Sequence, residues 1–222
     1  MANQFVYGRR PVAEAERGKR RVHRVWRAPE TPAEELERLC GSPDHQGVVA
    51  EVDPYPYGDP RALLAREGAL LVALDQVQDP RNLGAVCRSA EVAGAAGVVI
   101  PERRSAAVTP VVCKTSAGAV EHLEVAHVRN LADWLAEAKQ AGFWIWGADA
   151  AAEQTPWQAD LTGPTVLVLG GEGKGLRPRV ANACDGLIAL PQHGQVDSLN
   201  VSAAAAALLF ESVRQRGPAR NT

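Results

Sequence analysis

The chain has 222 residues, of which 46% are hydrophobic and 23% charged, and its formal net charge is −2. These values are typical of a globular protein, and no run approaches the roughly 18 apolar residues of a membrane-spanning helix. The N-terminus lacks the layout of a signal peptide, and the four scattered cysteines indicate neither a zinc site nor a disulfide framework. We therefore expect a cytoplasmic protein with no metal site and no membrane partner.

Positive charge is concentrated at the start of the chain. Residues 1–30 contain eight Lys or Arg and three Glu, a local net charge of +5, which leaves −7 for the rest. Six of the eleven residues at 17–27 are basic, and Trp26 among them offers a stacking surface. This asymmetry predicts an arm or small domain that contacts a polyanion; a charged face in water is the alternative.

Residues 8–53 have the pattern of a compact α/β unit. We expect one or two helical turns at Val12 to Glu16, and strands at Val22 to Trp26 and at Gly47 to Val52. Thr31 is a suitable helix N-cap, because a proline and two glutamates follow in the first turn.

A proline-rich segment follows this unit. Residues 53–60 contain three prolines, which exclude a regular element, so we interpret them as a linker. The sequence thus predicts two domains, a small basic one at residues 1–60, including the linker, and a larger one at residues 61–222.

From residue 69 onward, short apolar runs alternate with stretches of helical pattern. Apolar strands separated by helices predict a parallel sheet covered on both faces. The expected strands are Leu70–Leu74, Val98–Ile100, Phe143–Trp146, Val166–Leu169 and Leu187–Leu190. The expected helices are Asn82–Gly94, Pro110–His122, Leu131–Ala141, Pro178–Cys184 and Asn200–Arg214. The last of these is apolar nearly all round, so it should be buried against the sheet or a second subunit.

A glycine-rich turn follows the fourth of these strands. Four of the six residues at 170–175 are glycine, so a ligand could approach the backbone closely. Lys174 is followed by glycine rather than Ser or Thr, which excludes a P-loop, and the turn comes too late for a Rossmann fingerprint. Glu172 within it is a candidate functional carboxylate, although a plain tight turn between buried elements is the alternative.

Two further turns contain candidate functional residues. Asn82 is a plausible helix N-cap, and Arg88 lies in that helix among apolar residues, where a guanidinium needs an anionic partner. Ser198 and Asn200 precede the last helix, whose first N–H groups suit a polar or anionic ligand. His193 in the same segment is interpreted as a solvent-facing loop residue.

Three stretches occur in one order: Asn82-x-Gly84-x-x-x-Arg88, then Leu169-Gly-Gly-Glu-Gly-x-Gly175, then Leu190-Pro with Ser198-Leu-Asn-Val-Ser202. Together they resemble the motifs of the SpoU (TrmH) family of RNA 2′-O-ribose methyltransferases, in the SPOUT class, over roughly residues 69–216. Val6-Tyr7-Gly8 and His45-Gln-Gly-Val48 look like the substrate-binding domain of the rRNA guanosine methyltransferase branch, shortened between Arg27 and Gln46.

The resemblance implies an α/β fold: a Rossmann-like parallel sheet with a C-terminal deep trefoil knot, preceded by the small, shortened α/β substrate-binding domain. It also implies a homodimer with the final helix in its interface. S-adenosylmethionine would bind in the knot, held mainly by backbone atoms of Leu169, Gly170, Gly171, Leu190, Leu199 and Asn200. RNA would be the partner, contacted by Arg9, Arg20, Arg21 and Arg24.

The reaction that the resemblance implies is in-line attack of a ribose 2′-hydroxyl oxygen on the sulfonium methyl group. The catalytic candidates are Arg88, Asn82, Glu172 and Ser198. Arginine is a poor base, because its pKa is above about 12, so we assign Arg88 the stabilisation of charge on the attacking oxygen. Asn82 and Ser198 would hold the ribose or its phosphate, and no group is assigned as the base.

Several alternatives stay open at this point. Large-subunit rRNA is the favoured substrate, with tRNA as the alternative, and a role in self-protection against an antibiotic is compatible with both. A non-catalytic RNA-binding protein of the same fold is a further alternative. Binding alone would not need all five polar residues of the motifs, which are Asn82, Arg88, Glu172, Ser198 and Asn200. A small-molecule enzyme that uses a nucleotide would leave the basic N-terminus without a purpose.

Overall fold

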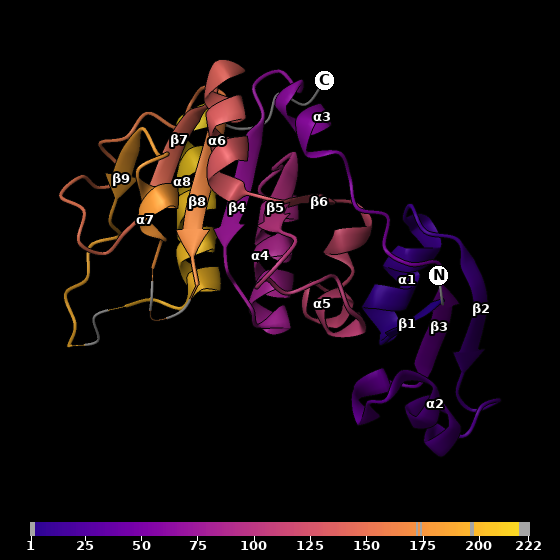
Figure 1. Ribbon diagram of the computed structural model, residues 1–222. Helices are drawn as coiled ribbons and strands as arrows, with labels where there is room; N and C mark the ends of the chain where they lie inside the picture. Colours follow the sequence, from indigo (N-terminus) through magenta and orange to yellow (C-terminus); the bar gives the residue numbers. More distant parts are fainter. Residues whose placement is uncertain (1–2, 172, 174, 196–197, 218–222) are drawn as a thin grey trace.

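The computed structural model describes residues 3–171, 173, 175–195 and 198–217 (Figure 1). A small antiparallel sheet has the strand order β1-β3-β2, and a larger sheet has the order β6-β5-β4-β8-β7-β9. All the strand pairs of the larger sheet are parallel. The fold is therefore the expected small α/β unit followed by a parallel α/β domain.

The elements of the small unit are β1 (Gln4–Tyr7), α1 (Arg9–Arg17), β2 (Val22–Arg27), α2 (Ala33–Cys40), the 3₁₀ helix η1 (Pro43–His45) and β3 (Val48–Val52). The strand β1 was not predicted, because its four residues are too short for a clear alternation. Thr31 was wrongly expected to cap α2: the cap position is Pro32, and no side chain caps this helix.

The strands of the larger sheet are β4 (Leu70–Asp75), β5 (Gly97–Pro101), β6 (Glu124–Val128), β7 (Trp144–Ala148), β8 (Thr165–Gly170) and β9 (Gly186–Ile188). Its helices are α3 (Pro60–Leu64), α4 (Pro80–Val92), α5 (Pro110–Thr115), the 3₁₀ helix η2 (Ala119–Glu121), α6 (Leu131–Gln140), α7 (Pro178–Ala181) and α8 (Val201–Arg216). The five expected strands are confirmed. The edge strand β6 was missed, because Glu124 and His127 interrupt its apolar run.

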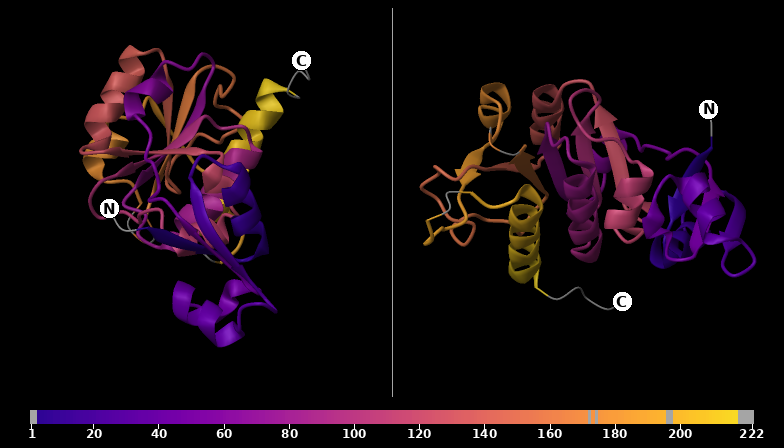
Figure 2. Two further views of the ribbon diagram at one scale, coloured as in Figure 1. Left: turned by 90° about the vertical axis from the view of Figure 1, so that its right-hand side faces the viewer. Right: turned by 90° about the horizontal axis from the view of Figure 1, so that it is seen from below.

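Alternate residues of each central strand point to opposite faces, and each face has its own helices. Leu70, Val72 and Leu74 of β4 pack with residues of α4, α5 and α8. Leu71 and Ala73 pack with residues of α3, α6 and α7. Seen along the strands, the sheet lies between these two helical layers (Figure 2). Burial on both faces explains why the strands read as continuous apolar runs.

The start of α4 differs from the expectation. Asp79, rather than Asn82, is the N-cap, and its carboxylate accepts a hydrogen bond from the backbone N–H of Arg81 at 2.7 Å. Asn82 lies inside the first turn of the helix and is buried. Its side chain is therefore available for contacts between elements instead of capping its own helix.

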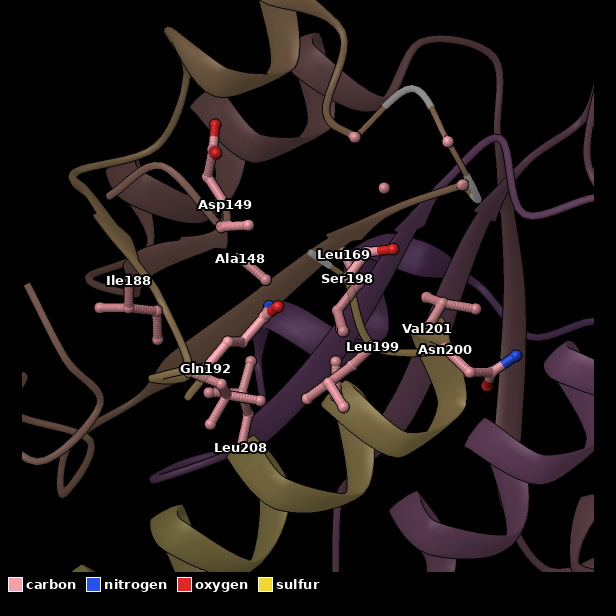
Figure 3. Close-up of a pocket in the computed structure, with 17 residues that line it drawn as sticks. Ala148, Asp149, Leu169, Ile188, Gln192, Ser198, Leu199, Asn200, Val201 and Leu208 are labelled. Carbon is pink, nitrogen blue, oxygen red and sulfur yellow. The ribbon is translucent and has the colours of Figure 1, made fainter. Parts of the chain in front are cut away.

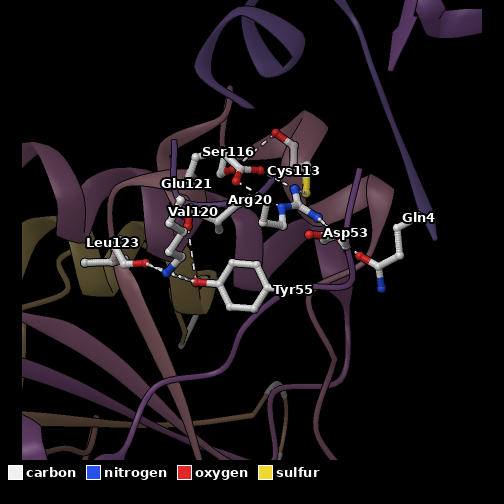
Figure 4. A network of polar contacts seen from close by, with 10 residues as sticks. Gln4, Arg20, Asp53, Tyr55, Cys113, Ser116, Val120, Glu121 and Leu123 are labelled. Carbon is white, nitrogen blue, oxygen red and sulfur yellow. Dashed lines mark hydrogen bonds and ion pairs between the residues drawn. The ribbon is translucent and has the colours of Figure 1, made fainter. Parts of the chain in front are cut away.

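The small unit packs directly against the larger domain. Val6, Val12 and Val52 share one apolar core with Val112 and Val120. Tyr55, within the proline-rich segment, is buried, and its hydroxyl lies 3.1 Å and 3.0 Å from the carbonyl oxygens of Val120 and Leu123 (Figure 4). Residues 53–57 form no helix or strand, as expected, but the segment is anchored to the larger domain. The boundary between residues 60 and 61 stays a prediction.

Arg20 was expected to contact RNA, and the structure contradicts this. Its guanidinium is fully buried and forms an ion pair with the equally buried Glu121 of η2, with the Nε–Oε2 distance at 3.0 Å (Figure 4). It also donates to Sγ of Cys113 at 3.4 Å. Arg20 therefore joins the two units of the chain, and RNA cannot reach it without local unfolding.

The last helix is only partly buried in the single chain. Val201, Ala205, Leu208 and Leu209 of α8 face the core, whereas Phe210 is 49% exposed. The expected trefoil knot stays a prediction, since residues 196–197 of the segment before α8 lie outside the described residues. No helix in the described ranges is long and apolar enough to cross a membrane.

Candidate functional site

A cavity of about 490 Å³ opens at the carboxyl ends of β7, β8 and β9 (Figure 3). Because these strands are parallel, the loops that follow them meet at one edge of the sheet, which is where open α/β sheets bind ligands. The start of α8 closes the fourth side of the cavity. Leu169, Gly170, Gly171, Leu190, Leu199 and Asn200 all line it, so the structure brings together every residue predicted to hold the cofactor.

The cavity combines apolar walls with polar groups. Leu169, Ile188 and Leu208 provide apolar surface, and Gln192 and Ser198 provide side-chain polar groups (Figure 3). Ligand cavities of 300–1,000 Å³ with this mixture suit a nucleoside-sized molecule that places its base on apolar surface. The residues therefore fit S-adenosylmethionine. The roles of the individual side chains in binding it stay predictions.

The glycines at the mouth of the cavity have a structural reason that the sequence did not reveal. A Cβ atom on Gly170 would overlap the backbone of Gly175, and one on Gly171 would lie 2.6 Å from the carbonyl oxygen of Gln76. Gly173 and Gly175 have φ angles of 74° and 61°, which glycine adopts without strain. The turn thus requires glycine in order to fold back on itself, whether or not a ligand approaches it.

A buried carboxylate holds this turn in place. Asp75, at the end of β4, accepts hydrogen bonds from the backbone N–H and Nε of Arg177 at 2.9 Å and 2.8 Å. The Gly171 N–H donates to the backbone carbonyl of Asp75 at 2.9 Å. The pair was not predicted as part of the site, although an aspartate that ends an otherwise apolar strand was a signal of such a role.

An amide pair connects the cavity to α4. Asn200 caps α8, and its Oδ1 accepts a hydrogen bond from the Ser202 N–H at 2.9 Å. Its Nδ2 donates to Oδ1 of Asn82 at 3.0 Å. Asn82 does not line the cavity itself, yet it touches a residue that does. The structure therefore joins Asn82 to the cavity residue Asn200, and Ser198 lines the same cavity.

Arg88 lies away from this group. It is on the same helix as Asn82, but its side chain is exposed and does not line the cavity. The expectation that it needs an anionic partner because of its apolar neighbours was wrong, since Val86, Cys87 and Ala90 face the core while Arg88 faces solvent. Glu172, the fourth catalytic candidate, lies outside the described residues.

The cysteine next to Arg88 is excluded as a nucleophile. Burial raises the pKa of the Cys87 thiol to about 12. The thiol of Cys113 is also buried, which raises its pKa to about 11. Both stay protonated at neutral pH, and a protonated thiol is a weak nucleophile.

The remaining basic candidates lie on the surface of the small unit. Arg9, Arg21 and Arg24 are exposed. The Arg24 guanidinium lies 4.9 Å from the centroid of the Trp26 ring. Both belong to β2, which is an edge strand of the small sheet. This cation and aromatic pair on an open edge suits an RNA backbone and an unstacked base.

Two family models match the chain. The SpoU rRNA methylase family matches residues 69–210, and the substrate-binding domain of RNA 2′-O-ribose methyltransferases matches residues 27–58. YacO of Bacillus subtilis, named for the TrmH family of tRNA/rRNA methyltransferases, is 37% identical over 97% of this chain and 97% of its own length. The 23S rRNA (guanosine-2′-O-)-methyltransferase RlmB of Pseudomonas putida is 48% identical over 78% of this chain and 71% of its own length.

Solved structures agree with these matches. AviRb, a SpoU methyltransferase of Streptomyces viridochromogenes solved in complex with S-adenosylmethionine, superposes with a TM-score of 0.81 at 29% identity. The match covers 97% of this chain and 91% of that one. Some relatives are longer: the chain spans 61% of an uncharacterised tRNA/rRNA methyltransferase of Mycolicibacterium smegmatis.

Proposed function

Since the chain belongs to the SpoU family of S-adenosylmethionine-dependent RNA 2′-O-ribose methyltransferases, we propose that its substrate is a ribose of large-subunit rRNA. The observation that supports this best is the 48% identity to RlmB, a 23S rRNA (guanosine-2′-O-)-methyltransferase, together with a cavity built from the family's motif residues. A tRNA substrate is the second candidate, because the name of YacO covers both kinds of RNA.

Bound S-adenosylmethionine supplies a methyl group already activated on a sulfonium. The chain must therefore hold the 2′-hydroxyl in line with that group and stabilise charge on its oxygen. We assign the cofactor contacts to Leu169, Gly170, Gly171, Leu190 and Leu199, with Asn200 holding the start of α8. Asn82 and Ser198 position the ribose or its phosphate. Arg88 contributes its positive charge to the attacking oxygen.

The cofactor assignment predicts a sharp contrast between two glycine variants. Gly170→Ala should abolish measurable S-adenosylmethionine binding, because the new Cβ overlaps the Gly175 backbone and displaces the turn. Gly163→Ala is the matched control, since a Cβ there meets nothing within 4 Å. Calorimetry should show micromolar-range binding for the wild type and for the control, with no competition from NAD. Wild-type affinity in Gly170→Ala would contradict the assignment.

We also propose that the family's expected homodimer forms through α8. Phe210 of α8 is 49% exposed and Val92 of α4 is 65% exposed, and these two helices pack against each other. Phe210→Glu should convert a dimer into a monomer in sedimentation velocity, because a charge would be buried in an apolar contact. A wild-type protein that sediments as a monomer would contradict the proposal.

The small unit is proposed to bind RNA through its exposed edge strand. Replacing Arg21 and Arg24 with glutamate should weaken RNA binding and lower the slope of log affinity against log salt by about 2, one for each lost phosphate contact. Arg20 is left unchanged because it is buried. Cofactor affinity should stay at the wild-type value. A wild-type salt slope in this variant would mean that these charges only face water.

A further inference from the structure

The larger domain, residues 61–222, contains 15 Lys or Arg and 16 Asp or Glu, a net charge of −1, yet it has a cationic hollow of its own. The hollow has a volume of about 350 Å³ and lies at the carboxyl ends of β4, β5 and β6. Its lining includes Gln76 and five arginines: Arg103, Arg104, Arg129, Arg177 and Arg179. None of these five was among the residues assigned to RNA from the sequence.

Two of the arginines are already paired with carboxylates. Arg177 holds the buried Asp75, and Arg179 lies 2.6 Å from the exposed Asp133. Arg103, Arg104 and Arg129 are all exposed, and in the described part of the chain no carboxylate lies within 4 Å of their guanidinium nitrogens. Glu102 lines the neighbouring hollow beside Arg129 and offsets part of this charge. The hollow therefore keeps a surplus of uncompensated guanidinium groups.

The backbone of this hollow is also unusual. Arg104 has a φ angle of 59° and Gln76 one of 63°, and both line the hollow. Residues with side chains avoid this left-handed region, where glycine would be less strained. Strained positions of this kind are common at functional sites.

The hollow lies beside the cofactor cavity, on the same edge of the sheet. Gly171, which lines the cavity, packs against the backbone of Gln76, which lines the hollow. In the strand order, β5 and β6 are two and three places from β8, about 10 Å and 14 Å at the usual strand spacing. The small unit lies beyond β6 (Figure 1). In the order of the sheet, the strands that carry the hollow thus lie between the cavity and the small unit.

We infer that Arg103, Arg104 and Arg129 form a second RNA-binding surface, which grips backbone phosphates of the strand whose ribose enters the cofactor cavity. This rests on the proposed function, since it assigns part of the same substrate. Guanidinium groups bind phosphate oxygens in a bidentate manner, and such contacts fix the register of the RNA without reading its sequence. The surface would align the RNA between the edge strand of the small unit and the cavity.

Three variants of the full chain test the inference. Arg103→Gln combined with Arg129→Gln should raise the Kd for an unmodified large-subunit rRNA transcript by on the order of tenfold and lower its salt slope by about 2. Arg104→Gly should also weaken RNA binding while leaving the melting temperature unchanged or higher, because it relieves the positive φ. Arg66→Gln is the matched control: Arg66 pairs with Glu124 at the opposite end of β6 and should leave Kd within about twofold.

Each outcome decides the inference. Wild-type Kd and salt slope in the double variant would overturn it, and so would an equal loss in Arg66→Gln, which would indicate a mere effect of net charge. S-adenosylmethionine affinity, measured by calorimetry, should not change in any of the three variants. If the wild-type protein methylates rRNA and the double variant binds that rRNA as tightly as the wild type, the proposed function stands and only the assignment of this surface is wrong. If wild-type protein methylates no RNA, the proposed function is wrong.

Discussion

Replacing Arg88 with alanine should reduce turnover by on the order of 100-fold or more and leave S-adenosylmethionine affinity nearly unchanged. Loss of one donor that stabilises charge in a transition state usually has an effect of this size. The cofactor should be unaffected, because Arg88 is exposed and does not line the cavity. The measurement is the single-turnover rate of methyl transfer at saturating cofactor, with calorimetry in parallel.

Arg88→Lys separates the shape of the side chain from its charge. Lysine keeps the positive charge but lacks the planar fork of arginine, so it should restore only a small part of the rate. The melting temperature of both variants should match that of the wild type, since an exposed side chain contributes little to stability. Near-normal turnover in Arg88→Ala would remove Arg88 from the mechanism.

The second large effect concerns stability. Arg20→Met should lower the free energy of unfolding by about 3–5 kcal/mol and the melting temperature by about 6–20 °C. The substitution leaves the carboxylate of Glu121 buried without its ion-pair partner, as both side chains are fully enclosed. It also removes the contacts of Arg20 with Gln4 and the backbone of Asp53, which belong to the small unit.

Urea unfolding of the single and double variants measures this effect. Arg20→Met combined with Glu121→Leu removes both charges, and it should recover most of the lost stability, because buried ion pairs are often no more stable than apolar replacements. A single variant as stable as the wild type would show that Glu121 finds water or another partner. If the double variant is as unstable as the single one, the lost free energy of unfolding comes from packing and not from the unpaired charge.

Much of the sheet could be predicted because its strands are buried on both faces. Leu70–Leu74 and Val166–Leu169 contain only apolar residues, so their pattern does not depend on distant contacts. β6 was missed because Glu124 pairs with Arg66 and His127 stacks on Tyr57, contacts that a sequence window does not contain. Arg20 was misassigned for the same reason, since its partner Glu121 is far away in the chain.

The cofactor residues could be predicted only through the family resemblance. They come from the end of β8 with the turn after it and from the segment between β9 and α8, and nothing in the spacing of Leu169, Leu190 and Leu199 indicates that they meet. The glycine turn was correctly singled out, but its reason was not: Gly170 and Gly171 meet other parts of the chain rather than open space. The pair of Asp75 and Arg177 and the hydrogen bond between Asn82 and Asn200 required the structure.

The central claim is that this chain methylates the 2′-oxygen of a ribose in large-subunit rRNA. Purified full-length protein should be incubated with methyl-labelled S-adenosylmethionine and unmodified transcripts of large-subunit rRNA and of tRNA, and the labelled nucleotide should then be mapped. We expect one rRNA nucleotide to be labelled, with resistance to alkaline cleavage at that position because its 2′-hydroxyl is blocked. Label on tRNA alone, label on a base, or no label on either RNA would contradict the claim.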